Sequence, residues 1–295
     1  MFELRFTSCM AAHTDFVCRE IAGYVSRRAN IEVSFVGDIP WPERERQLNG
    51  GNIQIGWICG LPYVRQADQI DSTIELLAAP VMLDERYQGR PIYFSDVVVR
   101  QDSPVQTFAD LQGATWAYNE PGSQSGYNVT RYYLARLGHA AGYFGRVVRA
   151  GAHQMALQMV LNGDVNASAI DSTVLEFELQ RQPQIARQIR IIDTFGPSPV
   201  PPWVIQKSVP EPLKQALRQL LVEMGEDEEG QAILAQWDIS RFVAVSDSDY
   251  NPIREMAQVA EQVNWGLEIV SLQSPISNRL HSSPNLLYRA RIDQA

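Results

Sequence analysis

A run of glycine, serine and amide residues between positions 119 and 127 offers the clearest chemistry in this sequence. It reads Asn-Glu-Pro-Gly-Ser-Gln-Ser-Gly-Tyr and contains Ser123, Gln124, Ser125 and Gly126. A Gly/Ser loop that leads into a helix gathers backbone N–H groups and hydroxyls around one point, and the helix dipole adds positive potential there. The run therefore predicts an oxyanion site, although a serine N-cap followed by a glycine turn has the same pattern.

Two further polar residues follow at the ends of later segments. His153 comes after Gly151-Ala at the start of a predicted helix, where an imidazole can donate a hydrogen bond to an anion. The helix dipole disfavours the imidazolium, so a neutral donor is expected; a histidine that faces water is the alternative. Asp171 fits a cation acceptor, an acceptor for a protonated oxyanion, or a turn residue. His13, His139 and His281 have no such context and are assigned no role.

Composition and charge limit the partners. The 295 residues carry a net charge of −9, and 45% are hydrophobic, so the chain can bury a sizeable core and two lobes are expected. The absence of a basic stripe argues against nucleic acid and anionic membranes, so any anion must be bound locally. The spacing of Cys9, Cys18 and Cys59 favours neither a disulfide framework nor a zinc site. No metal or cofactor is predicted.

The start of the chain bears on location. The first ten residues contain no basic segment followed by an apolar one, and no stretch approaches 18 uninterrupted apolar residues. We therefore expect no membrane span. The protein is expected to be periplasmic or on the cell surface if a signal peptide has been removed from this numbering, and cytoplasmic otherwise.

Alternating strands and helices must position these residues, and this βαβαβ pattern favours a parallel sheet. Prolines in 196–203 exclude a central strand and predict a return crossing, and the tail from residue 274 is expected to wrap the surface. Strands are predicted at 2–6, 31–36, 53–58, 73–79, 92–99, 114–118, 145–150 and 167–170, an apolar segment at 189–193, and helices at 14–28, 43–49, 126–137, 153–162, 174–182, 211–225, 228–237 and 251–263.

Seven stretches in order carry a resemblance to a known family. They are residues 51–57, 89–95, 108–113, 121–127, 151–153, 162–171 and 230–250. Over about residues 30–255 the chain resembles the phosphonate-, phosphite- and phosphate-binding subunits of ABC importers, which have the type II periplasmic binding protein fold.

The resemblance implies an α/β fold with two lobes, each a mixed, mainly parallel sheet flanked by helices. Two hinge crossings join the lobes, and the ligand lies in the cleft between them. We place the crossings near residues 98–103 and 194–203. Lobe one is then 1–98 plus 204–295, and lobe two is 99–203. A monomer is expected.

The resemblance also implies roles for single residues. The Ser123–Gly126 loop would hold the phosphoryl oxygens with His153, and Tyr93 would contact the ligand, although a strand tyrosine covering the core is the alternative. Trp41 falls where members that bind aminoalkylphosphonates carry a cleft tyrosine. Those members read the ammonium group with acidic residues, but here one such position holds Thr173 and 199–203 has no carboxylate. The sequence therefore argues against 2-aminoethylphosphonate.

The expected function is binding of a small phosphonate- or phosphate-like oxyanion for an ABC permease and ATPase. No nucleophile elbow, phosphate-binding loop with lysine or His-Glu-x-x-His motif is present, so an enzyme is not predicted. Two alternatives stay open. One is a cytoplasmic enzyme on the same fold, similar to chorismate dehydratase or the pyrimidine synthases of thiamine formation. The other is a solute sensor for a receptor kinase, in which Cys9 or Cys59 faces the cleft.

Overall fold

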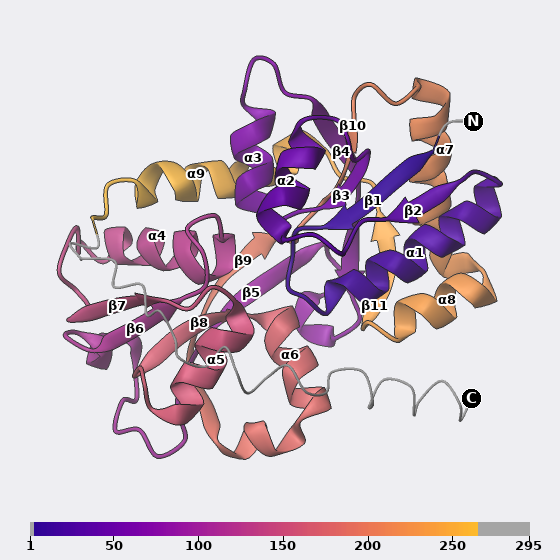
Figure 1. Ribbon diagram of the computed structural model, residues 1–295. Helices are drawn as coiled ribbons and strands as arrows, with labels where there is room; N and C mark the ends of the chain where they lie inside the picture. The colour runs from indigo at the N-terminus through magenta and orange to yellow at the C-terminus, as the bar shows by residue number, and fades with distance from the viewer. Residues whose placement is uncertain (1–2, 265–295) are drawn as a thin grey trace.

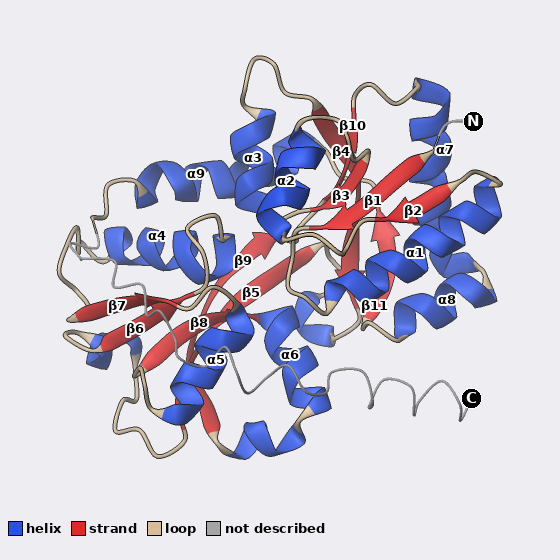
Figure 2. Cartoon of the chain, in the orientation of Figure 1, coloured by secondary structure: helices blue, strands red, loops and turns tan. Residues whose placement is uncertain are grey.

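Strands of this protein form two separate sheets in the computed structural model, which describes residues 3–264 (Figure 1). Within that range, one sheet has six strands in the order β11-β4-β10-β3-β1-β2, and the other has five in the order β7-β6-β8-β5-β9. Helices flank both sheets (Figure 2). We call the parts built on these sheets the first lobe and the second lobe. The predicted two-lobed α/β fold is confirmed. The expectation that each sheet is mainly parallel is wrong, because four of the strand pairings are parallel and five are antiparallel.

The first lobe begins with the parallel unit that the alternating pattern predicted. β1 (Leu4–Ser8) pairs in parallel with β2 (Val33–Phe35) and β3 (Ile55–Trp57), and α1 (Thr14–Ala29) and α2 (Trp41–Asn49) connect them. Parallel strands end at the same edge of a sheet, so the segments after β1 and β3 meet there. The lobe also contains α3 (Gly60–Ala67), β4 (Ile74–Met82), β10 (Trp203–Gln206), α7 (Glu211–Val222), α8 (Glu228–Ala235) and β11 (Ile239–Val243).

The second lobe repeats this arrangement. β6 (Thr115–Tyr118) is parallel to β7 (Arg146–Arg149) and β8 (Ala167–Asp171), so these strands also end at a common edge. A π-helical turn (Gln124–Asn128), α5 (His153–Asn162) and α6 (Ser172–Arg181) begin close to that edge. The lobe is completed by α4 (Val129–Arg136), β5 (Ile92–Arg100) and β9 (Ile189–Pro199), the last two of which pair antiparallel.

Short 3₁₀ turns and one further helix complete the described chain. The turns are Glu85–Tyr87, Phe108–Leu111, Pro183–Arg187, Glu223–Glu226 and Asp247–Tyr250. α9 (Asn251–Ala260) contacts α3 of the first lobe and α4 of the second, and Figure 1 shows it passing over both. α9 therefore contacts both lobes instead of belonging to the first alone.

The strand at residues 92–99, which the sequence analysis gave to the first lobe, lies in the second sheet. β5 pairs with β8 and β9, so the chain leaves the first sheet between β4 and β5, at residues 83–91, and not at 98–103. The return falls between β9 and β10, at residues 200–202. β5 is largely buried on both faces and fits either sheet by composition, so only its pairing decides its place.

Prolines confine β9 to the edge of its sheet, as the sequence predicted. The predicted return crossing at 194–203, however, contains the end of β9 and the first residue of a central strand. β9 is the edge strand of the second sheet and holds Pro197 and Pro199. Trp203, directly after two prolines, begins β10 between β3 and β4, so a central strand starts at the last residue of the predicted crossing.

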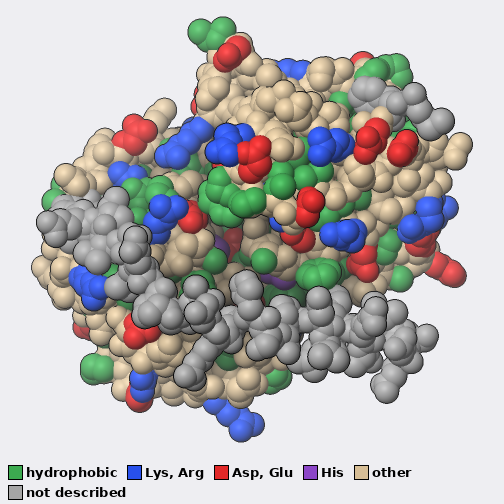
Figure 3. Space-filling model, in the orientation of Figure 1, with side chains coloured by type: hydrophobic (Ala, Val, Ile, Leu, Met, Phe, Trp, Pro, Cys, Tyr) green, Lys and Arg blue, Asp and Glu red, His purple; other side chains and the backbone are tan. Residues whose placement is uncertain are grey.

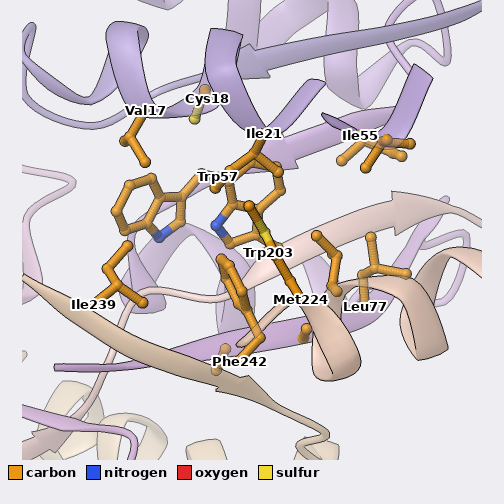
Figure 4. Close-up of a cluster of buried hydrophobic side chains, with 14 of the residues drawn as sticks. Val17, Cys18, Ile21, Ile55, Trp57, Leu77, Trp203, Met224, Ile239 and Phe242 are labelled. Carbon is orange, nitrogen blue, oxygen red and sulfur yellow. The ribbon is translucent and has the colours of Figure 1, made fainter. Parts of the chain in front are cut away.

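Trp203 also lies in the largest buried cluster of the first lobe. Its ring centroid is 5.9 Å from that of Trp57 and 5.8 Å from that of Phe242, and it is fully buried (Figure 4). Aromatic pairs at these separations pack tightly and stabilise a core. This cluster fixes β3, β10 and β11 and so supports the edge where β1 and β3 end.

Element boundaries agree with the prediction within a few residues for most elements, and α5 begins and ends where predicted. α3, β10 and β11 were not predicted. The expected surface tail from residue 274, including His281, lies outside the described residues.

Candidate functional site

The Gly/Ser loop between β6 and α4 forms a π-helical turn. Ser123 Oγ accepts a hydrogen bond from Gly126 N at 3.0 Å and caps the turn. A Cβ on Gly126 would lie 2.1 Å from Asn119 Oδ1 and 3.0 Å from His153 Cε1, so only glycine fits there. Such π-helical turns are frequent at functional sites.

Three of the predicted residues form a buried hydrogen-bonded group. Ser125 Oγ lies 3.0 Å from His153 Nε2 and donates to Asp171 Oδ2 at 3.3 Å. The Asp171 backbone N–H donates to His153 Nδ1 at 3.5 Å, so Nδ1 is an acceptor and the ring proton belongs on Nε2. Residues from the π-helical turn, α5 and the end of β8 are thus joined.

Burial sets the charge of this group. It lowers the pKa of His153 to about 3, so the imidazole is neutral near pH 7, as the sequence analysis expected. Burial also raises the pKa of Asp171 to about 6, even though hydrogen bonds from Thr173 and Ser125 favour its charged form. Without a ligand, the neutral imidazole thus donates to Ser125 and Ser125 donates to Asp171, so these donors must turn from one another to an anion when it binds.

A cavity of about 340 Å³ lies against this group and between the lobes. That volume is in the range of roughly 300–1,000 Å³ found for small-molecule sites. Figure 3 shows this face, with histidine and acidic side chains visible in a recess between the lobes. The first lobe lines the cavity with Cys9, Asp15, Trp41, Arg44, Glu45 and Cys59, and the second with Asn119, Glu120, Ser123, Ser125, His153 and Asp171.

Helix N-termini supply positive potential to the cavity. α3 begins after Cys59 and α5 after Ala152, both of which line the cavity, and neither helix has a side-chain cap. The N–H groups of an uncapped first turn are available to an anion, and the dipole favours negative charge there. An oxyanion can therefore be held here without a formal cation.

Five of the nine predicted site residues line the cavity, namely Trp41, Ser123, Ser125, His153 and Asp171. Gln124 and Thr173 support it instead. The Gln124 side chain bonds to Asn128, Ser198 and the Met256 sulfur, while Thr173 donates its N–H and hydroxyl to Asp171 Oδ1. Gly126 allows the turn to approach His153 closely.

Tyr93 lies behind the cavity surface. Its side chain is 1% exposed in β5, and its hydroxyl has no hydrogen-bond partner. Burial raises the pKa of Tyr93 well above its usual value, and the charges of Cys59 and Asp171 add to the rise, while the nearby Ser125 hydroxyl opposes it without reaching hydrogen-bond geometry. A buried hydroxyl without a partner calls for an explanation, and its closeness to Asp171 connects it with the site.

The sequence analysis missed several residues that line the cavity, and for two cysteines it left open whether they face it. Cys9 and Cys59 both face the cavity, and burial raises the pKa of each thiol, that of Cys9 to about 12. Asp15, Arg44 and Glu45 were not singled out. A signal existed for the last two, because positions three and four residues after Trp41 share its helix face.

The buried group differs from a hydrolytic triad. In such a triad the carboxylate bonds to the histidine, which in turn accepts the serine proton. Here the Asp171 carboxylate accepts from Ser125, and only the backbone of Asp171 contacts His153. Among residues 3–264, no group of three or more His, Cys, Asp or Glu is placed to hold a metal ion. No helix in this range has the length and apolar character needed to cross a membrane.

Proteins of similar sequence support a family assignment. The family model for the periplasmic substrate-binding protein of ABC phosphonate transporters matches residues 17–250. The phosphonates-binding periplasmic protein of Escherichia coli (strain K12) is 27% identical over 214 residues, which are 71% of this chain and 61% of that protein. The chain therefore spans less than two thirds of the length of this relative.

Solved structures share the fold. A binding protein component of an ABC phosphonate transporter from Pseudomonas aeruginosa has a TM-score of 0.76 at 21% identity, over 88% of this chain and 86% of that one. PhnD1 from Prochlorococcus marinus (MIT 9301), in complex with methylphosphonate, has a TM-score of 0.76 at 17% identity, over 88% and 99% of the two chains. These matches confirm the type II fold. Since the family model covers well over half of the sequence, the chain belongs to the family of periplasmic phosphonate-binding proteins of ABC transporters.

Proposed function

We propose that this protein is the substrate-binding component of an ABC importer and binds a small phosphonate-like oxyanion between its lobes. The family assignment supports the class of protein, and the methylphosphonate complex of a structural relative supports the class of ligand. The observation that carries the proposal is the buried group Ser125, His153 and Asp171 on the wall of the interlobe cavity.

The second lobe provides the first binding surface. Ser123, Ser125 and His153 face the cavity beside the uncapped start of α5, so hydroxyl, imidazole and backbone donors converge. The first lobe adds Trp41, the Cys59 thiol and the uncapped start of α3. Closure excludes water, which strengthens each hydrogen bond to the anion.

Contacts between the lobes lie beside the cavity. Gln124 N donates to Cys59 Sγ at 3.4 Å, which joins the π-helical turn to the start of α3. A ligand that touches both walls would add to this contact and so favour the closed arrangement. Delivery to a permease and its ATPase in the periplasm follows from the family and is part of the proposal.

Calorimetry tests the proposal. Wild-type protein should bind methylphosphonate, and the Ser125→Ala, His153→Ala double variant should lose at least a hundredfold in affinity, because two donors of about 1.5 kcal/mol each are removed. Ser103→Ala, His139→Ala is the matched control, since neither residue lines the cavity. Unchanged affinity in the first variant would exclude this site.

A further inference from the structure

One carboxylate in the cavity wall has no partner among the described residues. Four carboxylates line the cavity, and Glu45 is the one whose side chain makes no hydrogen bond or ion pair within residues 3–264. The other three are each held by a neighbour, in the pairs Asp15–Arg44, Glu120–Arg149 and Asp171–Thr173. The first-lobe wall therefore presents a negative charge that no described donor or cation compensates.

Glu45 faces the cavity from α2, across from the oxyanion group of the second lobe. Burial raises the pKa of Glu45, so its carboxyl is partly withdrawn from water. Burial also raises the pKa of the Cys9 thiol to about 12, and the Glu45 charge adds to that rise, which places the carboxylate near Cys9 in the wall. An anion held by Ser125 and His153 would be repelled by this charge unless the ligand also carried a cation.

An aromatic side chain lies beside this carboxylate. Trp41 begins α2 four residues before Glu45, so the two share one face of the helix, and both line the cavity. The Trp41 side chain is 39% exposed, and its ring is available to a ligand. A tryptophan face attracts a cation through the ring quadrupole, and a carboxylate next to it adds direct charge attraction. The pair thus fits a positively charged group.

The rest of this wall favours a cation without hydrogen-bond donors. Met10, Ile58 and Pro62 also line the cavity from the first lobe, and their side chains offer no strong acceptor. A primary ammonium has three N–H donors, and each one left without an acceptor costs free energy when water is excluded. A quaternary ammonium has none, and its methyl groups pack against aromatic and apolar side chains.

We propose that Trp41 and Glu45 form a second subsite, which binds the quaternary ammonium group of a ligand whose phosphoryl oxyanion is held by Ser125 and His153. The inference rests on the proposed function and adds the tail of its ligand. The ligand class is a zwitterion such as phosphocholine or the corresponding phosphonate, 2-(trimethylammonio)ethylphosphonate. Methylphosphonate would occupy only the oxyanion end of the cavity of about 340 Å³.

Calorimetry on the wild-type protein tests the charge of the tail. The probes are 2-(trimethylammonio)ethylphosphonate and its neutral tert-butyl analogue, in which carbon replaces nitrogen, so that they differ in charge and hardly in shape. The cationic probe should bind at least tenfold more tightly than the neutral one, and at least tenfold more tightly than 2-aminoethylphosphonate. Phosphocholine against its own neutral analogue extends the test to phosphate esters, and a preference for the cation in either series supports the subsite.

Two variants locate the effect in the wall, and the readout is the ratio of cationic to neutral affinity within each protein. Glu45→Gln keeps the size of the side chain without its charge, so the ratio should fall about tenfold. Trp41→Leu keeps an apolar contact without the ring face, so the ratio should fall about two- to fivefold. Glu43→Gln is the matched control, because Glu43 lies on the same helix, pairs with Arg46 and does not line the cavity. It should keep the wild-type ratio.

Three results would overturn the subsite. They are equal affinity for the cationic and neutral probes in both series, tighter binding of 2-aminoethylphosphonate than of its trimethylated form, and a wild-type ratio in Glu45→Gln. Each leaves the proposed function intact as long as wild-type protein binds methylphosphonate. Wild-type protein that binds neither methylphosphonate nor the longer probes overturns the proposed function as well.

Discussion

Asp171 combines a structural role and a binding role in one carboxylate. Its Oδ1 caps α6, while its Oδ2 faces the cavity group, and burial raises its pKa to about 6. A folded-state pKa above the usual value means that the carboxyl contributes most to stability at low pH, and that this contribution is lost as the pH rises through about 6. A shift of two units corresponds to about 3 kcal/mol.

Replacing this carboxylate should therefore stabilise the ligand-free protein. We expect Asp171→Asn to raise the free energy of unfolding near pH 8 by on the order of 2 kcal/mol and to change it little near pH 4, where the acid is protonated in the fold. Urea unfolding at both pH values measures the difference, with Asp164→Asn as the exposed control. If Asp171→Asn is less stable than wild type near pH 8, burial of the Asp171 charge does not destabilise the fold as we expect.

The hydroxyl of Tyr93 provides a second test of a single group. It is buried without a partner, so Tyr93→Phe should leave stability unchanged or raise it by about 1 kcal/mol. If the ligand supplies the missing partner, the same variant should lose about tenfold in methylphosphonate affinity.

Tyr143→Phe is the matched control for this variant. The Tyr143 hydroxyl donates to the Phe108 carbonyl at 2.7 Å, outside the cavity. The control should lose about 1 kcal/mol of stability and keep its affinity. If Tyr93→Phe binds methylphosphonate with wild-type affinity, Tyr93 only packs in the core, which is the alternative that the sequence analysis gave for it.

At the scale of elements, the turn between β6 and α4 depends on one glycine. Gly126→Ala would bring a Cβ to 2.1 Å from Asn119 Oδ1, so the turn or Asn119 must move. We expect this variant to lose more than tenfold in methylphosphonate affinity and about 1–3 kcal/mol of stability. Gly23→Ala, inside α1, meets only the flexible end of Arg27 and should be neutral or stabilising. A Gly126→Ala protein with wild-type affinity for methylphosphonate would show that binding does not require this turn geometry.

The sequence predicted local structure better than pairing. The helix that begins at His153 and the strand before the 119–127 run were predicted from hydrophobic periodicity and the positions of glycines. These two elements place the site residues Ser123, Ser125 and His153. Nothing local distinguishes the two sheets for the apolar strand at 92–100, and Trp203 joins a central strand only because tertiary packing buries it. The first-lobe wall was largely missed because Arg44 and Glu45 resemble ordinary surface residues of a charged helix.

At the scale of the whole molecule, an aromatic contact joins the lobes beside the cavity. The His13 ring, just before α1, stacks on Phe177 of α6 with centroids 4.1 Å apart, and Phe177 lies 6.1 Å from Trp237 of the first lobe. The Gln154 side chain of α5 lies 3.3 Å from His13 Nδ1. A residue that the sequence analysis assigned no role thus connects the first lobe to two helices of the second.

This contact makes the arrangement of the two lobes sensitive to acid. Burial, with a smaller effect from Arg181, lowers the pKa of His13 to about 4, so the interlobe contact is complete above the usual histidine pKa and is lost as the pH falls through about 4. Small-angle scattering should show a larger radius of gyration for the ligand-free protein near pH 4 than near pH 7, while far-UV circular dichroism stays native. His13→Phe keeps the stacked ring without the titrating group and should remove most of this expansion. His139→Phe, within the second lobe, should not. Equal expansion in both variants would assign the acid response to other groups, because of these two histidines His13 is the one whose ring lies between the lobes.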